Sequence, residues 1–231
     1  MKIGIVIATY FRNDGRSKFF LSRCLKSISE QTHKEYKVFL IGDKYENSTE
    51  FEAISGSIIE GEKIHAENLT YAKERDVYHS DPDKLWCAGG VNAINYGIEK
   101  AISEGYDYIC HLDHDDYWHP IHLESISNFL DNNQNYIFVA TYCNYLNKYN
   151  VPLRSAPGDY YPQDGDITHS ATCVKFSDID LRYRDVFFET GESFPADADL
   201  WIRLRKHMQS KDLKGSLLGI ITTYLDKPER G

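Results

Sequence analysis

The chain has 231 residues, with 26 Lys and Arg against 35 Asp and Glu and a formal net charge of −9. This acidic balance argues against a nucleic-acid partner, and no apolar run has the length needed to span a bilayer. The five cysteines are odd in number and form no Cys-x-x-Cys pair, which disfavours zinc and disulfide frameworks and favours a reducing cytoplasm.

The first half of the chain alternates predicted strands and helices. Apolar runs predict strands, and apolar residues recurring every three or four positions predict helices. In chain order these are strand Ile3–Thr9, helix Phe20–Ile28, strand Tyr36–Gly42, a short helix at Phe51–Ile54, a longer helix over Val91–Ile102, and strand Tyr108–Leu112. Such alternation predicts an α/β fold with a mostly parallel sheet and helices on both faces.

The second half has a different pattern, which predicts a smaller antiparallel part. Tyr149-Asn150 suits a turn between two strands, and residues 155–168 are rich in turn formers and predict a surface loop. Strands are expected at Ile137–Tyr145, His169–Phe176 and Leu217–Tyr224, and a helix after Asp199 that carries Leu200, Leu204 and Met208. We find no repeat or linker, so one domain is expected over residues 1–231.

Three carboxylates follow the strand that ends at Leu112: Asp113, Asp115 and Asp116. Carboxylates this close repel one another unless a cation neutralises them. Oxygen-only ligands suit Mg²⁺ or Mn²⁺, which bind through one or two carboxylates and a substrate's phosphates. The pattern therefore predicts a metal-diphosphate site. The alternative is an acidic turn that caps a helix beginning near Pro120.

Other polar residues also follow predicted strands. Thr9-Tyr10 and Asp43 stand at strand carboxyl ends, as do the three carboxylates. In parallel sheets, ligands bind outside this edge. We therefore expect the three segments to converge on one crevice.

Four segments in this order resemble the family 2 glycosyltransferases of the GT-A fold. Ile5-Val-Ile-Ala-Thr-Tyr10 resembles the family's opening strand, and Ser22 to Gln31-Thr32 its first helix. Asp113-His-Asp-Asp-Tyr-Trp-His-Pro120 is similar to its Asp-x-Asp-Asp-x-Trp-x-Pro pattern. Asp197-Ala-Asp-Leu-Trp-Ile-Arg-Leu204 is similar to the Asp-x-Asp-Leu-Trp-x-Arg-Leu segment that carries the catalytic base.

The resemblance implies a Rossmann-like sheet and an inverting, metal-dependent transfer of a sugar from a nucleotide sugar to a hydroxyl of a glycan or other acceptor. A UDP-sugar is the expected donor. Residues 1–116 would form the nucleotide-sugar-binding half and residues 117–231 the acceptor-binding half. Because the sequence ends at Glu229-Arg230-Gly231, directly after its last predicted strand, we expect a domain of a longer polypeptide or a compact enzyme with a short acceptor side.

The chain departs from the family pattern at three places. Gly42-Asp43-Lys44-Tyr45 stands where the family usually has Asp-Asp-Gly-Ser. Ala93-Ile94-Asn95-Tyr96-Gly97 lacks the arginine of Ala-Arg-Asn-x-Gly, and Ala196 replaces a usual Glu. A donor contact or an internal ion pair is therefore missing or supplied by another residue.

The resemblance also implies residue roles. Asp113 and Asp115 would hold Mn²⁺ or Mg²⁺, while Asp116 orients the turn. Asp43 would accept the N3–H of uracil. Asp197 would be the general base, or alternatively the cap of its helix. The remaining nucleotide-sugar-binding residues would be Thr9, Tyr10, Arg12, Gly89, Gly90, Asn92 and His114, with Asp113 shared.

The acceptor residues expected are Trp118, His169 and Asp199, and Trp86, Tyr160 and Tyr161 are further candidates for stacking on sugars. Trp201, at helical spacing, is expected in the core. Two other functions stay open: a nucleotidyltransferase that makes sugar nucleotides, and a non-catalytic carbohydrate-binding module. The single glycine and Arg12 in Ala8–Gly15 disfavour the first, because that class has a Gly-rich, basic loop there.

Overall fold

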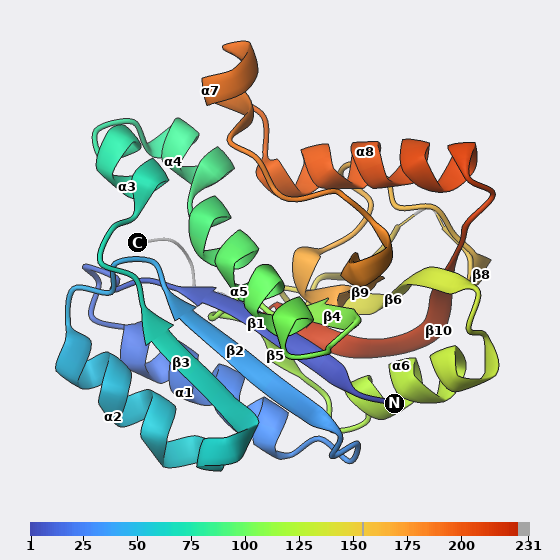
Figure 1. Cartoon of the computed structure of the whole chain (residues 1–231), viewed down its shortest axis with the longest axis horizontal. Helices are drawn as coiled ribbons and strands as arrows, with labels where there is room; N and C mark the ends of the chain where they lie inside the picture. The colour runs from blue at the N-terminus through green and yellow to red at the C-terminus, as the bar shows by residue number, and fades with distance from the viewer. Residues whose placement is uncertain (154, 226–231) are drawn as a thin grey trace.

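The computed structural model describes residues 1–153 and 155–225. Ten strands of the described chain form one sheet in the order β3-β2-β1-β4-β9-β6-β10-β5, with β7 paired to β6 and β8 to β10. Helices cover both faces of this sheet (Figure 1). The α/β class and the helices on both faces are confirmed.

The first half of the chain forms the parallel part of the sheet. It contains β1 (Ile3–Thr9), β2 (Tyr36–Gly42), β3 (Ile64–Asn68) and β4 (Tyr108–His111). β1 pairs in parallel with both β2 and β4, and β3 pairs in parallel with β2. All four carboxyl ends therefore meet at one edge, where the predicted site residues follow.

Alternation along β1 sorts the core into two layers. Ile3, Ile5 and Ile7 pack with α1 (Ser17–Ser29), α2 (Ser48–Ile58) and α6 (His122–Asn132). Val6 points the other way and shares a cluster with α5 (Val91–Ser103) and α8 (Ala196–Ser210). The two helix layers lie on opposite sides of the sheet in Figure 1. Both layers bury apolar area, which is the main favourable term in folding.

The second half forms the mixed part of the sheet, as expected. β9 (Thr172–Lys175) runs antiparallel to both β4 and β6 (Tyr136–Tyr145), so it joins the two halves. β10 (Lys214–Leu225) runs parallel to β6 with register shifts and bends strongly (Figure 1). The shorter strands are β5 (Tyr117–Trp118), β7 (Tyr149–Val151) and β8 (Gly158–Asp159).

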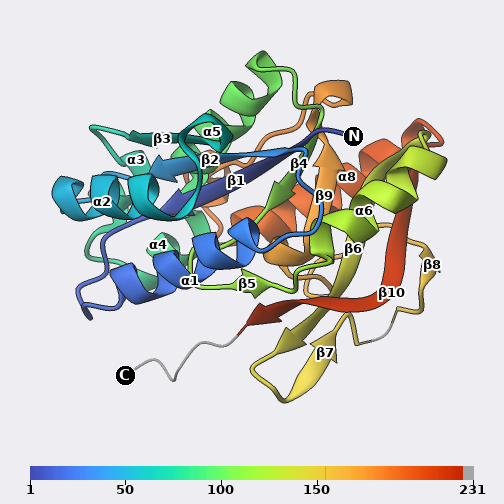
Figure 2. The same cartoon turned by 90° about the horizontal axis from the view of Figure 1, so that it is seen from below.

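Three sequence predictions are wrong in detail. The strand expected over His169–Phe176 is only β9, flanked by the 3₁₀ turns His169–Ala171 and Phe176–Asp178. The turn expected at Tyr149-Asn150 lies at Leu146 and Asn147, whose positive φ angles reverse the chain into the β6–β7 hairpin (Figure 2). α8 begins at Ala196 rather than after Asp199, because Ala196 and Leu200 already bury its inner face.

The sequence pattern did not predict several elements. They are β3, the 3₁₀ turn Gly61–Lys63, α3 (Lys73–Tyr78), α4 (Pro82–Ala88) and α7 (Val186–Thr190). Within the described part of the chain, no helix combines the length and apolar character needed to cross a membrane. Glu229-Arg230-Gly231, on which the expectation about the chain's end depends, lie outside the described residues.

Candidate active site

A cavity of about 560 Å³ opens at the carboxyl ends of β1, β2 and β4. We call it the first cavity. The convergence predicted from three strand ends is therefore present. Eight of the nine residues expected to bind the nucleotide sugar line it: Thr9, Tyr10, Arg12, Asp43, Gly89, Gly90, Asp113 and His114.

Asn92 is the expected residue that does not line this cavity. It lies in the first turn of α5, two residues after Gly90, whose φ of +85° is the left-handed conformation that glycine tolerates. Because of this turn, the glycine backbone faces the cavity. Asn92 therefore lies outside the lining of the first cavity, and its role toward the nucleotide sugar stays a prediction.

Asp43 is held by an arginine that the sequence reading missed. The carboxylate is 1% exposed, and Arg75 Nε on α3 donates to Asp43 Oδ2 at 2.6 Å. The Arg75 guanidinium also lies over the Tyr10 ring, 3.6 Å from its centroid. Burial raises the pKa of Asp43, and the charge of Arg75 opposes that rise. Arg75 thus forms an internal ion pair with Asp43 in a chain whose Ala93-Ile94-Asn95 lacks the family's arginine.

The three carboxylates after β4 form a compact cluster. Asp113, Asp115 and Asp116 each place a carboxylate oxygen within 4.8 Å of the others. Ser170 Oγ donates to Asp116 Oδ2 at 2.6 Å and accepts the Asp113 N–H at 3.0 Å. Asp116 is thus tied to the turn. An all-oxygen donor set of this kind suits a hard divalent cation.

Arginines from α1 and from the loop before it contact the same turn. Arg23 Nη2 donates to the Asp115 carbonyl at 2.6 Å, and Arg12 Nη1 lies 3.7 Å from Asp115 Oδ2. The helix-capping alternative fails for this cluster, because α6 begins only at His122 and its N-cap is Ile121. Asp113 and Asp115 line the first cavity instead.

A second cavity of about 840 Å³ adjoins the first. The two cavities share Trp86, Gly89, Ile94 and Asp113, so Asp113 stands at their junction. Asp197 lines the second cavity from the first turn of α8. This cavity takes residues from both halves of the chain.

Asp197 is not the cap of α8. The N-cap is Pro195, and Asp197 Oδ1 accepts the neighbouring N–H of Ala198, at 2.8 Å. Burial raises the pKa of Asp197, while the charge of His169 opposes the rise. A carboxylate with a raised pKa in a cavity wall is a candidate general base.

His169 lines the second cavity too and contacts the carboxylate cluster. Its Nδ1 lies 2.9 Å from Asp113 Oδ1 and its Nε2 lies 2.8 Å from the Tyr183 hydroxyl. Because a carboxylate only accepts, Nδ1 carries a proton and donates it to Asp113. The ring also stacks on the buried His111, with centroids 4.4 Å apart. His169 therefore orients Asp113, a role that Tyr183 supports and that the sequence did not show.

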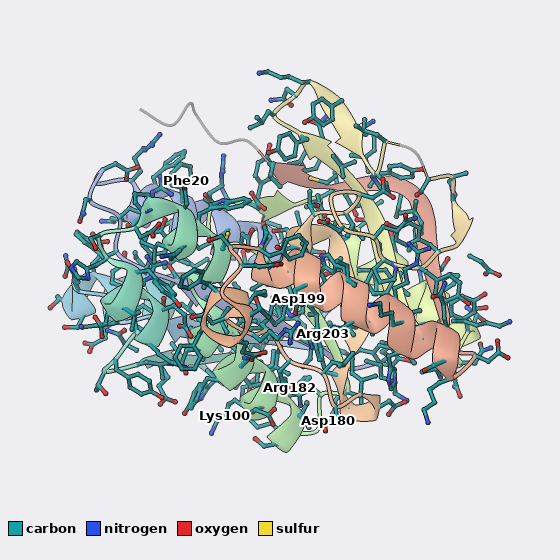
Figure 3. All side chains as sticks on the ribbon, turned by 90° about the horizontal axis from the view of Figure 1, so that it is seen from above. Phe20, Lys100, Asp180, Arg182, Asp199 and Arg203 are labelled. Atoms are coloured by element: carbon teal, nitrogen blue, oxygen red, sulfur yellow. The ribbon has the colours of Figure 1, made fainter. Side chains whose placement is uncertain are left out.

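Two expected acceptor residues lie elsewhere. Trp118 is 2% exposed, donates from Nε1 to the Ser170 carbonyl and stacks on His122, so no ring face remains for a sugar. Asp199 is ion-paired at 2.7 Å to both Arg184 and Arg203 and lines neither cavity (Figure 3). The structure therefore brings neither residue to the first or second cavity, and their positions do not favour the acceptor role expected for them.

The aromatic residues expected to stack on sugars also differ in where they lie. Tyr160 is buried and lines neither cavity, and Tyr161 lines neither as well. Trp201 is in the core, as expected. Trp86, on α4, is 63% exposed and lines both cavities. It is the candidate whose position fits stacking.

Comparisons with known proteins indicate the family of this chain. The profile of the family described as Glycosyl transferase family 2 matches residues 87–200, which include the carboxylate cluster and Asp197. A curated relative, the uncharacterized glycosyltransferase R139 of Acanthamoeba polyphaga mimivirus, is 33% identical over 219 residues. That alignment covers 91% of this chain and 87% of the relative.

Solved structures show the same fold at low sequence identity. The S. aureus TarS 1–349 complex with UDP superposes with a TM-score of 0.68 at 14% identity, over 97% of this chain and 60% of TarS. The UDP-GlcNAc complex gives 0.67 at 14%, over 100% and 60%. The mannosyltransferase PcManGT from Pyrobaculum calidifontis, with GDP-Man and Mn²⁺, gives 0.61 at 12%, over 100% and 58%. The chain thus spans about 60% of the TarS chains, and the GT-A fold is confirmed.

Proposed function

The chain belongs to glycosyltransferase family 2, and from this premise we propose that it transfers a sugar from a UDP-sugar to a hydroxyl of a carbohydrate acceptor with inversion. One observation carries the proposal. Two cavities meet at Asp113, and a half-buried carboxylate, Asp197, lines the second of them. A donor in the first cavity would present its sugar to an acceptor in the second.

The first cavity fits the nucleotide. Asp43 would accept the N3–H of uracil, and Arg75 fixes its carboxylate in place. Tyr10, held under the Arg75 guanidinium, would lie against the base or ribose. Arg12 and Arg16 also line this cavity and would offset phosphate charge. The UDP and UDP-GlcNAc complexes of the similar TarS support uridine as the nucleoside.

Asp113 and Asp115 fit a divalent cation, because both present carboxylate oxygens within one small cluster. When bound, Mn²⁺ or Mg²⁺ supplies positive charge that stabilises the leaving diphosphate. The similar PcManGT complex contains Mn²⁺, which supports this assignment. Asp116 is tied to Ser170 and would hold the turn rather than the ion.

Asp197 would activate the acceptor. Its carboxylate takes the proton of the acceptor hydroxyl as the hydroxyl oxygen attacks the anomeric carbon. The new C–O bond forms on the face opposite the diphosphate, the bond from the anomeric carbon to the diphosphate oxygen breaks, and UDP leaves with that electron pair. One displacement of this kind inverts the anomeric centre. His169 would keep Asp113 aligned during the step.

The alternative functions are less well supported. Family membership sets the chain among glycosyltransferases rather than nucleotidyltransferases. A non-catalytic carbohydrate-binding module would need no carboxylate base beside the donor site. That function predicts no metal-dependent turnover, so one assay distinguishes it from ours.

The assay measures UDP release from UDP-glucose, UDP-galactose, UDP-GlcNAc and UDP-xylose, with GDP-mannose as a comparison, in Mn²⁺ or in EDTA. We expect at least one UDP-sugar to be hydrolysed with Mn²⁺ and not with EDTA. Asp115→Ala should abolish that hydrolysis. Asp180→Ala, an exposed carboxylate that lines neither cavity, is the matched control. No turnover of any UDP-sugar, or full turnover by Asp115→Ala, contradicts the proposal.

A further inference from the structure

The two cavities differ in where positive charge lies. Arg12, Arg16 and Arg75 line the first cavity. Among the residues that the structure describes, no lysine or arginine lines the second cavity, whereas Asp113, Asp116 and Asp197 do. Cationic side chains are therefore concentrated where a diphosphate would bind.

The arginines on and near α8 do not add positive charge to the second cavity. Arg184 and Arg203 are each ion-paired at 2.7 Å to Asp199, which lines neither cavity. Figure 3 shows Asp199 and Arg203 together on α8. Arg184 also pairs with Glu189 at 2.9 Å, so the two arginines are matched by two carboxylates.

We propose that the second cavity takes an uncharged carbohydrate acceptor, held by its apolar face against aromatic side chains, and that it rejects phosphorylated acceptors. This inference rests on the proposed function and specifies its acceptor class.

The charges that line the second cavity disfavour a charged acceptor. A phosphate entering the second cavity would lose water without gaining a lysine or arginine partner among the described lining residues, and the lining His169 already donates to Asp113. It would also face the carboxylate of Asp197, and like charges in contact disfavour binding. A cationic acceptor fits poorly for another reason. It would pair with Asp197, lower the pKa of that carboxyl and weaken it as a base.

Aromatic and apolar side chains form much of the remaining lining of the second cavity. Trp86 presents an exposed ring where the two cavities join. Tyr145 and Tyr149 stack in the β6–β7 hairpin with centroids 5.3 Å apart and an interplanar angle of 11°. Leu153 adds an exposed apolar side chain. Aromatic faces suit the C–H face of a sugar ring, while its hydroxyls reach the few polar groups.

Size agrees with a small acceptor. The second cavity, about 840 Å³, lies within the range of about 300–1,000 Å³ typical of small-molecule sites. It would hold a short glycoside or the terminal residues of a glycan.

Tryptophan fluorescence offers a direct test. Trp118 and Trp201 are buried, so iodide quenching reports on the exposed Trp86. The probes are methyl glucoside, methyl galactoside and cellobiose, set against glucose 6-phosphate, galactose 6-phosphate and glucosamine, with UDP and Mn²⁺ saturating. We expect the neutral sugars to protect Trp86, and the phosphates to bind about tenfold or more weakly.

Three results would overturn the inference: phosphates that bind as tightly as the neutral sugars, a preference for glucosamine, or no protection by any sugar while UDP with Mn²⁺ still binds. Failure of UDP with Mn²⁺ to bind would instead contradict the proposed function. The sugar series repeated without UDP then still decides the charge preference.

A charge-insertion variant tests the cause. Leu153→Lys adds a cation to the second cavity at an exposed position and should improve glucose 6-phosphate binding about two- to fivefold. Val77→Lys, equally exposed but outside both cavities, should behave as the unaltered protein. Melting temperatures of both variants check folding. No gain in phosphate binding by a folded Leu153→Lys would overturn the charge argument.

Discussion

Asp197 and Asp199 stand two residues apart in α8 and have opposite environments. Burial raises the pKa of Asp197. Burial also acts to raise the pKa of Asp199, but hydrogen bonds from Arg184 and Arg203 outweigh it and lower that pKa. One carboxylate is thus suited to take a proton and the other to hold two arginines. Environment rather than residue type assigns the two roles.

Asp197→Asn should separate catalysis from folding. The amide keeps the shape of the side chain and its acceptor for the Ala198 N–H but cannot take a proton. We expect transfer to fall about 10²–10⁴-fold, the usual contribution of general base catalysis, with donor binding nearly unchanged. Measurements of kcat and of UDP affinity check this. Normal turnover would rule out the base role.

Asp199→Asn is the matched variant. It should lower the melting temperature, because it leaves Arg184 and Arg203 without their carboxylate. Its UDP affinity should stay near that of the unaltered protein. A loss of turnover without a loss of stability would contradict the structural role of Asp199.

The raised pKa of Asp197 gives a pH dependence whose sign follows from linkage. Transfer needs the deprotonated carboxylate, so kcat should rise with pH and level off above a pKa higher than the ordinary aspartate value. Between those two pKa values the folded state binds the proton more tightly than the unfolded state, so stability falls as pH rises. Asp197→Asn should remove that fall. Melting curves across the acid range measure it, and a steeper fall in the variant would contradict the assignment.

At the scale of elements, the carboxylate turn is fixed by segments far apart in the chain. Gln31, just after α1, is fully buried; its amide donates to the carbonyls of Ser27 and His119 and accepts the Leu123 N–H. Ser170, before β9, bonds Asp116 and Asp113 from the other side. Gln31 therefore has a structural role: it anchors the segment from His119 to Leu123, which follows the carboxylate turn, to α1.

Ser170→Ala removes a single hydroxyl group but should weaken metal binding strongly. The change leaves the Asp113 N–H and the Asp116 carboxylate without this partner. Loss of such an orienting partner typically costs about 10–100-fold in metal affinity. Calorimetric titration of Mn²⁺ in the presence of UDP measures it. Ser127→Ala, another buried serine, bonded to Asp131 on α6, is the control and should keep normal affinity.

Some elements could be predicted from the sequence and others could not. Buried strands such as β1 and β2 are continuous apolar runs, and α5 repeats its apolar residues at helical spacing. β3 lies at the sheet edge, where Ile64-His-Ala-Glu-Asn68 is only half-buried, so its composition carries no clear signal. α3 is short and mostly polar. Arg75 was missed for that reason, since nothing local marks it as the partner of Asp43.

At the scale of the whole molecule, the sequence order of motifs predicts a common edge but not the shape of the site. That Asp113 belongs to two cavities depends on how β9 and α8 pack against the parallel half. Whether a tryptophan is buried or exposed depends on the same packing. Trp118 is enclosed between Ser170 and His122, whereas Trp86 projects from α4. Residue type alone does not distinguish the two.

The last prediction tests whether nucleotide, metal and fold act as one unit. A ligand that binds only the folded state stabilises it by about 2.7 kcal/mol at 100 times its Kd. For a chain of this size that corresponds to a rise in Tm of roughly 5–11 °C, at about 2–4 °C per kcal/mol. We therefore expect UDP with Mn²⁺ to raise the Tm by this amount, because the carboxylate turn and the loops around Asp43 and Arg75 all line the first cavity. EDTA or Asp115→Ala should remove most of the rise, while Asp197→Asn should keep it, because Asp197 lines only the second cavity. An equal rise in EDTA would mean that UDP binds through base contacts alone and that the carboxylate cluster does not hold the metal.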